Sequence, residues 1–207
     1  MQDFYDDLKP NRYYSVYNRS VSRDKLFLND ANYDFFLEKA KNYILPVTDF
    51  LAYNLLPNHF HFFVRVKKRS EIIAAHRLSA INKTIPLADD LLPGYVLKQW
   101  SDFCNSYAKS FNHLAARKGR LFMESIKRFE IVGVQQFKET VRAIHNNAIF
   151  HGPRRDLEDW PYSSYESIVN NTANWLKRDE VLGWFGGLKP FIRFHKITSG
   201  VIFNPGG

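Results

Sequence analysis

Alternation of apolar and polar residues is clearest in the stretch from residue 49 to residue 68. Residues 49–56 are predominantly apolar and predict a strand, and Pro57 and Asn58 supply turn chemistry. From residue 59 onward the two classes alternate, which predicts a second strand with His59 and His61 on the same face. The side chains expected on the opposite, core-facing side are Phe60, Phe62 and Val64.

The rest of the chain reads as one domain with an appended C-terminal segment. Residues 12–19 alternate as a strand, and residues 120–123 and 127–132 are predicted to pair as a short hairpin. Residues 1–10 read as a loose arm. Apolar residues recur at helical spacing, with fitting caps and breakers, over residues 29–45, 70–82, 95–117, 133–150, 165–169 and 174–183.

Composition bears on the cellular compartment in which the protein is expected. The 207 residues are 45% hydrophobic, and no window approaches the roughly 18 apolar residues of a membrane helix. The first ten residues lack an apolar secretion segment, and the single cysteine, Cys104, cannot form an internal disulfide. We therefore expect a cytoplasmic protein without a membrane partner, in which Cys104 is a packed core residue rather than a nucleophile.

The net charge of +8 points to an acidic partner, most commonly a nucleic acid. The basic residues come in short clusters rather than being evenly spread, which favours a phosphate-binding groove over a uniformly solvated surface. We expect them to lie beside the histidine face. The candidate phosphate contacts are Arg65, Lys67, Lys68, Arg69, Arg120, Lys127 and Arg128.

Several segments together resemble the histidine-hydrophobe-histidine (HUH) single-tyrosine transposases of insertion-sequence type, in particular the branch of REP-associated tyrosine transposases. The resemblance covers residues 11–165, in order and spacing. Its segments are NRYYSVYNR from Asn11, RDKLF from Arg23, LPNHFHFFV from Leu56, NSYAKSFN from Asn105, KGRLFM from Lys118, IHNNA from Ile144 and WPYSSY from Trp160.

The resemblance implies an α+β fold of the HUH transposase type. In this fold a ferredoxin-like antiparallel sheet carries helices on one face and the histidine pair on its open face. The transposase-like domain would occupy residues 11–165, between an N-terminal arm at residues 1–10 and a C-terminal helical extension at residues 166–207.

The resemblance also implies a chemistry. In the family the two histidines hold a divalent metal, Mg or Mn, which polarises a phosphate of single-stranded DNA, and a tyrosine from a facing helix attacks it to form a 5′-phosphotyrosine. Carried over residue by residue, His59 and His61 are the catalytic metal ligands, and Asn147 is an amide-type third ligand. Two imidazoles favour manganese more than magnesium.

The sequence departs from the family at the nucleophile. The family helix ends in Tyr-Ile-His-x-Asn-Pro, whereas this chain has Ala143 at the tyrosine position and Ala148 at the proline position. An alanine methyl cannot attack phosphorus, and none of the eleven tyrosines lies between residues 134 and 150. Tyr107 on another helix is an alternative nucleophile that the family pattern argues against, and His145 is expected to pack or hydrogen-bond rather than react.

Three functions remain open from the sequence. The first is a transposase relative that binds single-stranded or hairpin DNA, keeps the metal site and lacks single-tyrosine nicking. The second is an active transposase or nickase whose nucleophile is another tyrosine, a partner subunit's residue or metal-activated water. The third is a non-catalytic basic module that binds nucleic acid or protein and whose histidines are surface residues. Either a monomer or a homodimer is compatible with each.

Overall fold

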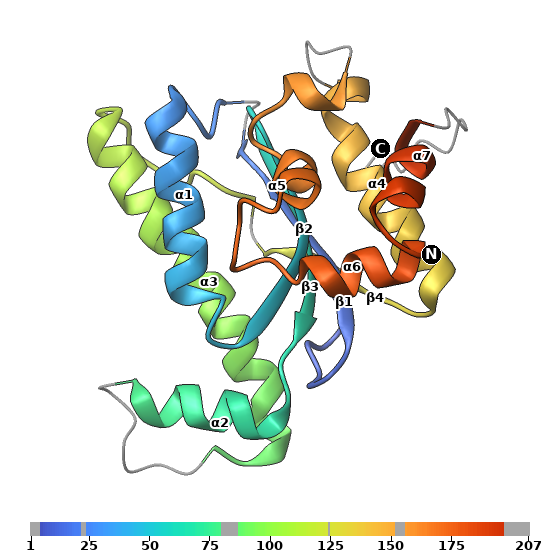
Figure 1. Ribbon diagram of the computed structural model, residues 1–207. Coiled ribbons are helices and arrows are strands. Elements are labelled where there is room, and N and C mark those ends of the chain that lie inside the picture. The colour runs from blue at the N-terminus through green and yellow to red at the C-terminus, as the bar shows by residue number, and fades with distance from the viewer. Residues whose placement is uncertain (1–4, 22–23, 80–86, 124, 152–155, 197–207) are drawn as a thin grey trace.

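A four-stranded antiparallel sheet forms the centre of the molecule (Figure 1). The structure, a computed structural model, describes residues 5–21, 24–79, 87–123, 125–151 and 156–196. The strand order is β2-β3-β1-β4, which together with the chain order strand–helix–strand–strand is ferredoxin-like. The α+β fold class predicted from the sequence is confirmed. The strands are β1 (Tyr13–Arg19), β2 (Thr48–Leu56), β3 (His59–Val66) and β4 (Lys127–Ile131).

Seven α-helices surround the sheet in the described part of the chain, and six of them agree with predicted segments to within a few residues. The seventh, at the C-terminal end, had no predicted counterpart, although Phe191, Ile192 and His195 have helical spacing. The helices are α1 (Asp30–Tyr43), α2 (Arg69–Leu78), α3 (Leu92–Leu114), α4 (Val134–His151), α5 (Ser164–Asn170), α6 (Arg178–Phe185) and α7 (Leu188–Lys196), with short 3-10 turns η2 (Asp89–Leu91) and η3 (Leu157–Asp159).

One face of the sheet packs against α1 and α3 (Figure 1). Phe60 and Phe62 point to this side of β3, as the alternation predicted, and both are fully buried. The ring of Phe36 on α1 lies 5.2 Å from that of Phe60, and Trp100 on α3 lies 5.8 Å from Phe62. These aromatic contacts form the main hydrophobic core.

The opposite face, which carries the histidines, is covered as well. The ring of Phe137 on α4 lies 4.5 Å from Tyr13 and 5.8 Å from Phe63, and Trp184 on α6 packs against the same rings. The expectation of helices on one face and an open histidine face is therefore corrected. The apolar stripe of α4 needs a surface to bury it, and the second face of the sheet provides that surface.

Both edges of the sheet are covered by other segments of the chain. Residues 162–177 follow β2, where Leu55 donates to the Tyr162 carbonyl and Lys177 to the Phe50 carbonyl. Residues 5 and 6 pair with β4, and the side chain of Leu8 is 1% exposed. Residues 5–10 are thus packed rather than loose, because covering an edge satisfies its backbone groups.

The predicted hairpin of residues 120–123 and 127–132 is only half correct. The second segment is β4, but Phe122 forms an isolated bridge with Ser20, just after β1. The Met123 amide donates to the Arg19 carbonyl, and the Val21 amide donates to the Leu121 carbonyl. Leu121 and Phe122 thus extend the far end of β1 rather than pairing with β4.

The histidine face and candidate nucleic-acid interface

His61 lies in the middle of the sheet, opposite Tyr17 of β1 and Asn54 of β2. Its side chain is 1% exposed, and its Nε2 lies 2.5 Å from the Oγ of Ser15, which is itself fully buried. Burial, followed by the nearby charge of His59, lowers the pKa of His61 to about 3, so the ring is neutral at physiological pH. A serine beside a histidine can be a nucleophile with its base, but both groups here are closed off from a substrate.

His59 begins β3 and is half-buried, with its Nδ1 2.9 Å from the Asn58 side-chain oxygen. It pairs with Arg19 of β1 and Leu56 of β2, at the end of the sheet. The two histidines project to one face, as the alternation predicted, but their surroundings differ. His59 sits at the rim of the sheet, while His61 lies under the helices that cover its face.

Helix α4 is anchored over this face by a buried asparagine. Asn54 is fully buried, and its Nδ2 donates to the carbonyls of Ile144 (2.7 Å) and His145 (3.3 Å). Its Oδ1 accepts a hydrogen bond from Trp160 Nε1 at 2.9 Å. These contacts fix the C-terminal half of α4, the segment with Ala143 and Asn147, against the strand next to the one that carries His61.

The residues at the nucleophile position and around it have distinct environments on α4. Ala143 is half-buried, and Asn147, one turn further on, is 3% exposed. The His145 ring contacts Ser164 and His195. Its Nε2 lies 2.7 Å from Ser164 Oγ, and its Nδ1 lies 2.9 Å from Nε2 of His195 on α7. The expectation that His145 packs and hydrogen-bonds is confirmed.

The donors named for a divalent metal lie in different environments. His61 uses Nε2 in its contact with Ser15 and is enclosed, and a hard cation such as magnesium prefers carboxylate and water oxygens. Within the described ranges no group of three His, Cys, Asp or Glu side chains could hold a metal. The metal site of His59, His61 and Asn147 therefore stays a prediction of the sequence, and the function proposed below does not depend on it.

The two tyrosines that bear on an alternative nucleophile are both buried. Tyr107 lies on the α1/α3 side of the sheet, away from the histidines, and donates to the Leu26 carbonyl at 2.6 Å. Burial raises its pKa above the usual value. Tyr17 is on the histidine face, with its ring 5.6 Å from that of His61, and burial raises its pKa to about 12. Forming a phenolate at either position is therefore unfavourable.

The basic residues fall at two opposite ends of the sheet. Lys127 pairs with Tyr17 at the histidine end, where Arg19 pairs with His59, and Arg120 directly precedes the segment bridged to Ser20. Lys67 follows β3 eight residues after His59, which at about 3.3 Å per residue places it roughly 26 Å away. The expectation that all the charge lies beside the histidines is therefore correct for Arg120 and Lys127 and wrong for the cluster of residues 67–69.

Three of the predicted phosphate contacts are committed to partners within the protein. Arg65 pairs with Asp49 and Glu180 across the sheet, and Arg69 pairs with Asp89. Arg128 is 7% exposed, and its guanidinium donates to the backbone carbonyls of residues 5, 6 and 126. It secures the N-terminal segment to β4, so its position does not support a role on a DNA-binding surface.

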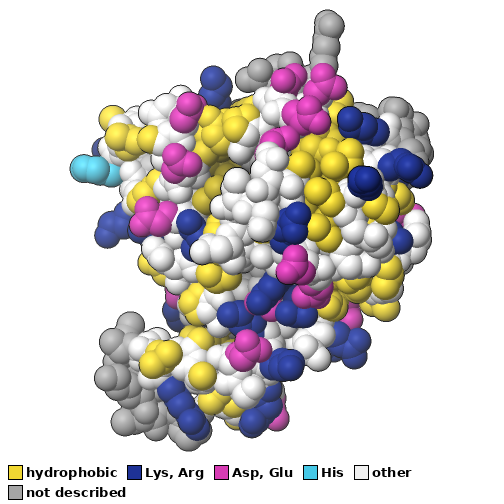
Figure 2. Space-filling view, in the orientation of Figure 1, with side chains coloured by type: hydrophobic (Ala, Val, Ile, Leu, Met, Phe, Trp, Pro, Cys, Tyr) yellow, Lys and Arg dark blue, Asp and Glu magenta, His cyan; other side chains and the backbone are white. Residues whose placement is uncertain are grey.

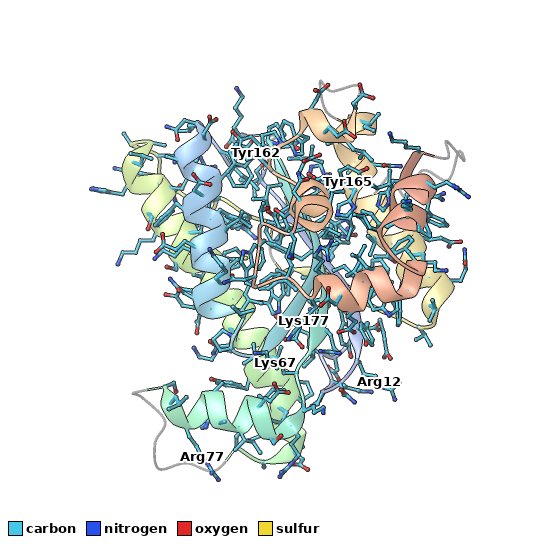
Figure 3. All side chains as sticks on the ribbon, viewed as in Figure 1. Arg12, Lys67, Arg77, Tyr162, Tyr165 and Lys177 are labelled. Carbon is cyan, nitrogen blue, oxygen red and sulfur yellow. The ribbon has the colours of Figure 1, made fainter. Side chains whose placement is uncertain are left out.

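Basic and acidic side chains are mixed on the surface next to α2. Lys67, Lys177 and Arg12 lie on the side of the sheet that faces α2 (Figure 3). Lysine and arginine side chains gather there, interspersed with acidic ones (Figure 2). Lys177 pairs with Asp49, and Arg12 with Glu130. The positive charge of this region is therefore partly neutralised.

The comparisons with known proteins found a likeness in fold and no match in sequence. No protein-family model and no curated protein matches the sequence. A solved structure of a REP-associated tyrosine transposase bound to a REP hairpin superposes on 86% of this chain and 90% of its own, with a TM-score of 0.60. The chain has the fold of that transposase. The two sequences are 14% identical, so the likeness concerns the fold.

In this transposase-like fold the sequence reasoning missed two residues that shape the histidine face. Ser15 engages His61, and Asn54 anchors α4. Asn54 could have been singled out, because it is a polar residue in a strand whose nine members are all buried, and buried polar groups require hydrogen-bond partners.

None of the helices in the described segments is long and apolar enough to cross a bilayer.

Proposed function

We propose that this protein binds hairpin or single-stranded DNA as a transposase-like protein and does not form a covalent tyrosine link to the strand. The observation that carries the proposal is the shared fold, over 86% of the chain, with a transposase whose structure contains a bound DNA hairpin. The net charge of +8 supports a polyanionic partner.

Two groups of exposed or half-exposed cations supply the phosphate contacts in this proposal. Arg19, Arg120 and Lys127 lie at the histidine end of the sheet, and Lys67 and Lys68 at the other end. The separation of roughly 26 Å along β3 corresponds to about eight base pairs of duplex at 3.4 Å each. A hairpin stem lying along the strand direction would reach both groups.

The proposal that the protein does not nick DNA rests on the residues of α4. Ala143 occupies the position where the resembling family has its nucleophilic tyrosine, and no residue of α4 is a tyrosine. Tyr17, which lies beside His61, would have to lose a proton from a buried phenol whose pKa is about 12. Neither position supplies a phenolate at neutral pH, so the protein would bind the strand without cutting it.

DNA binding is expected to depend on the two cationic groups and on salt. The double variants Arg19→Gln/Lys127→Gln and Lys67→Gln/Lys68→Gln should each weaken hairpin binding on the order of ten-fold at low salt and reduce the salt slope by about one per side chain. Fluorescence anisotropy over a salt series measures both quantities. The matched control is Lys189→Gln/Lys196→Gln on α7, which removes the same charge from exposed positions elsewhere. Equal losses in all three variants would show only a general charge effect.

Covalent chemistry is tested with labelled hairpin DNA and manganese, followed by denaturing electrophoresis. We expect no protein–DNA adduct from the wild-type protein, because it lacks a tyrosine on α4. We also expect none from Ala143→Tyr, because His61 remains enclosed and bonded to Ser15. An adduct from Ala143→Tyr would show that the metal site is intact and lacks only its nucleophile. An adduct from the wild type would overturn the proposal, and Tyr17→Phe would then identify the reacting residue.

A further inference from the structure

The surface over η3, α5 and α7 carries opposite charges at its two sides. On one side is an acidic cluster of three exposed carboxylates in or next to η3: Asp156, Glu158 and Asp159. On the other side is a basic stripe on α7, whose exposed cations recur at successive helical turns: Lys189, Arg193 and Lys196. Asp and Glu side chains gather at the top of the molecule, and Lys and Arg side chains lie over α7 (Figure 2).

The buried ring of Tyr165 on α5 links the two charged groups. It stacks on Phe191 of α7, with the ring centroids 5.8 Å apart, and projects from α5 toward α7 (Figure 3). Burial raises the pKa of the Tyr165 phenol, and the nearby carboxylates of Glu158 and Glu166 raise it further. The acidic cluster and the helix of the basic stripe therefore border the same pair of stacked rings.

Apolar side chains occupy the surface between the two charged groups. Figure 2 shows hydrophobic side chains between the acidic ones at the top and the basic ones over α7. The helices around the stacked rings carry half-buried apolar residues, namely Ile149 of α4, Val169 of α5, and Leu188, Ile192 and Phe194 of α7. An apolar centre with charged groups at its rim is the usual composition of a protein–protein interface.

The charges of this surface are not neutralised by other described residues. Within the described ranges, no member of the acidic cluster or of the basic stripe forms an ion pair. Arg142 of α4 adds a further cation beside α7, where its guanidinium lies over the Phe194 ring at 4.8 Å. Like charges at successive helical turns repel one another, so an opposite charge from a partner would stabilise the stripe.

This charge pattern is complementary to itself. A two-fold axis that lies in the interface, perpendicular to the line from the acidic cluster to the basic stripe, brings each cluster onto the stripe of the other copy. The same rotation places the apolar centre of one copy on that of the other. Both charge contacts form twice, and a second copy of the chain supplies the matching pattern without any further requirement.

We propose that two copies of this chain associate through this surface, with the acidic cluster of each copy against the basic stripe of the other. The partner is a second copy rather than an unrelated protein, because acidic, apolar and basic areas occur together in the order that a two-fold axis pairs. The inference goes beyond the proposed DNA binding and does not depend on it.

The test is complementary charge reversal, followed by sedimentation equilibrium of the protein alone at low salt. We expect the wild type to dimerise with a dissociation constant on the order of 10 µM. Glu158→Lys/Asp159→Lys and Lys189→Glu/Arg193→Glu each place like charges opposite one another. Each variant alone should therefore dimerise on the order of a hundred-fold more weakly than the wild type.

An equimolar mixture of the two reversed variants is the decisive sample. In the mixed dimer one contact joins two reversed groups and the other joins two native groups, so opposite charges face each other in both. The mixture should therefore dimerise within about three-fold of the wild-type affinity. Restoration by mixing also shows that each variant folds, because an unfolded variant could not provide the interface.

Control variants carry the same changes of charge on the other side of the sheet. They are Asp34→Lys/Glu38→Lys on α1, and Lys109→Glu/Lys118→Glu on and just after α3, all at exposed positions. Both should dimerise as the wild type does. Equal weakening in these controls would show only an effect of net charge and would overturn the proposed interface.

Three further outcomes would overturn the proposal. The first is a wild type that stays monomeric up to about 1 mM. The second is a mixture of the reversed variants that stays monomeric while the wild type dimerises, which would place the contact elsewhere. The third is a monomeric wild type that binds poly-L-glutamate through α7, which would assign the basic stripe to an acidic partner. No DNA is present, so these outcomes leave the proposed function untouched.

Discussion

Replacing Asn54 by alanine is expected to lower the free energy of unfolding by about 3 kcal/mol, because it leaves several buried polar groups without partners. Asn54 is fully buried, accepts from Trp160 Nε1 and donates to two carbonyls of α4. Alanine would remove the acceptor of the buried indole N–H and would also leave a small cavity. Chemical denaturation at pH 7 measures the change.

A double-mutant cycle isolates the hydrogen bond between Trp160 and Asn54. Trp160→Phe removes the indole N–H while keeping most of the ring, so Asn54→Ala should cost about 1 kcal/mol less in that background than in the wild type. Asn42→Ala on the exposed side of α1 is the matched control, with an expected change within about 0.5 kcal/mol. If Asn54→Ala and Asn42→Ala had similar effects, Asn54 would not be the anchor of α4.

His145 and His195 are together expected to destabilise the protein by about 4 kcal/mol between pH 7 and pH 5, in addition to the effect of His61, whose pKa burial also lowers. Burial, and then the charge of the other histidine, lowers the pKa of His145 well below its usual value of 6.5. Burial, together with Arg142, lowers the pKa of His195 to about 4, against a smaller opposing effect of its hydrogen bond to Phe191. The unfolded chain therefore binds protons near pH 6.5 that the folded protein binds only at lower pH.

The direction of the effect follows from which state binds more protons. Above pH 6.5 both histidines are neutral in both states and carry no penalty. As the pH falls from 6.5 toward 4, the unfolded state is protonated while the folded state is not, so stability declines by about 1.4 kcal/mol per pH unit and per histidine. At pH 5 that amounts to roughly 2 kcal/mol for each histidine.

The hydrogen bonds around these histidines explain why the folded state resists protonation. The Tyr53 N–H donates to Ser164 Oγ, and the Ser164 hydroxyl donates to His145 Nε2, with the Tyr53 carbonyl as a longer alternative acceptor at 3.3 Å. His145 Nδ1–H donates to His195 Nε2, and His195 Nδ1–H donates to the Phe191 carbonyl. Among the described residues, Tyr165 of α5 and Arg142 of α4 also face the pair, and neither carries a negative charge at neutral pH. A proton added at His145 Nε2 would have to donate to Ser164 Oγ and turn the Ser164 hydroxyl toward the Tyr53 carbonyl, 3.3 Å away, and burial still disfavours the added charge.

The pH effect is measured by urea denaturation of the wild type and of His195→Gln at pH 7 and pH 5. The variant loses one of three buried histidines with a lowered pKa, so the difference in unfolding free energy between the two pH values should fall by about 2 kcal/mol. His113→Gln, at an exposed position on α3, is the control and should retain the full difference. A full difference in His195→Gln would mean that other groups cause the acid sensitivity.

The local pattern of the sequence was sufficient for most of the fold. A two-residue period fixed β3 and the shared face of His59 and His61, because side chains alternate along any strand. The Asn29 cap placed the start of α1, where its side chain accepts from the Asn32 amide. The hairpin of residues 120–132 failed, because the partner of Phe122 is Ser20, a hundred residues away, and no local pattern contains that information.

By itself, the sequence determined that this chain has no tyrosine on α4, that its histidines share a strand face and that its charge suits a polyanion. Only the tertiary structure decided which of these groups DNA could reach. Antiparallel pairing puts Lys127 beside Tyr17 and Lys67 at the far end of β3, and the folded chain encloses His61. Accessibility depends on what the other elements cover, and spacing along one segment does not specify the position of a helix eighty residues further on.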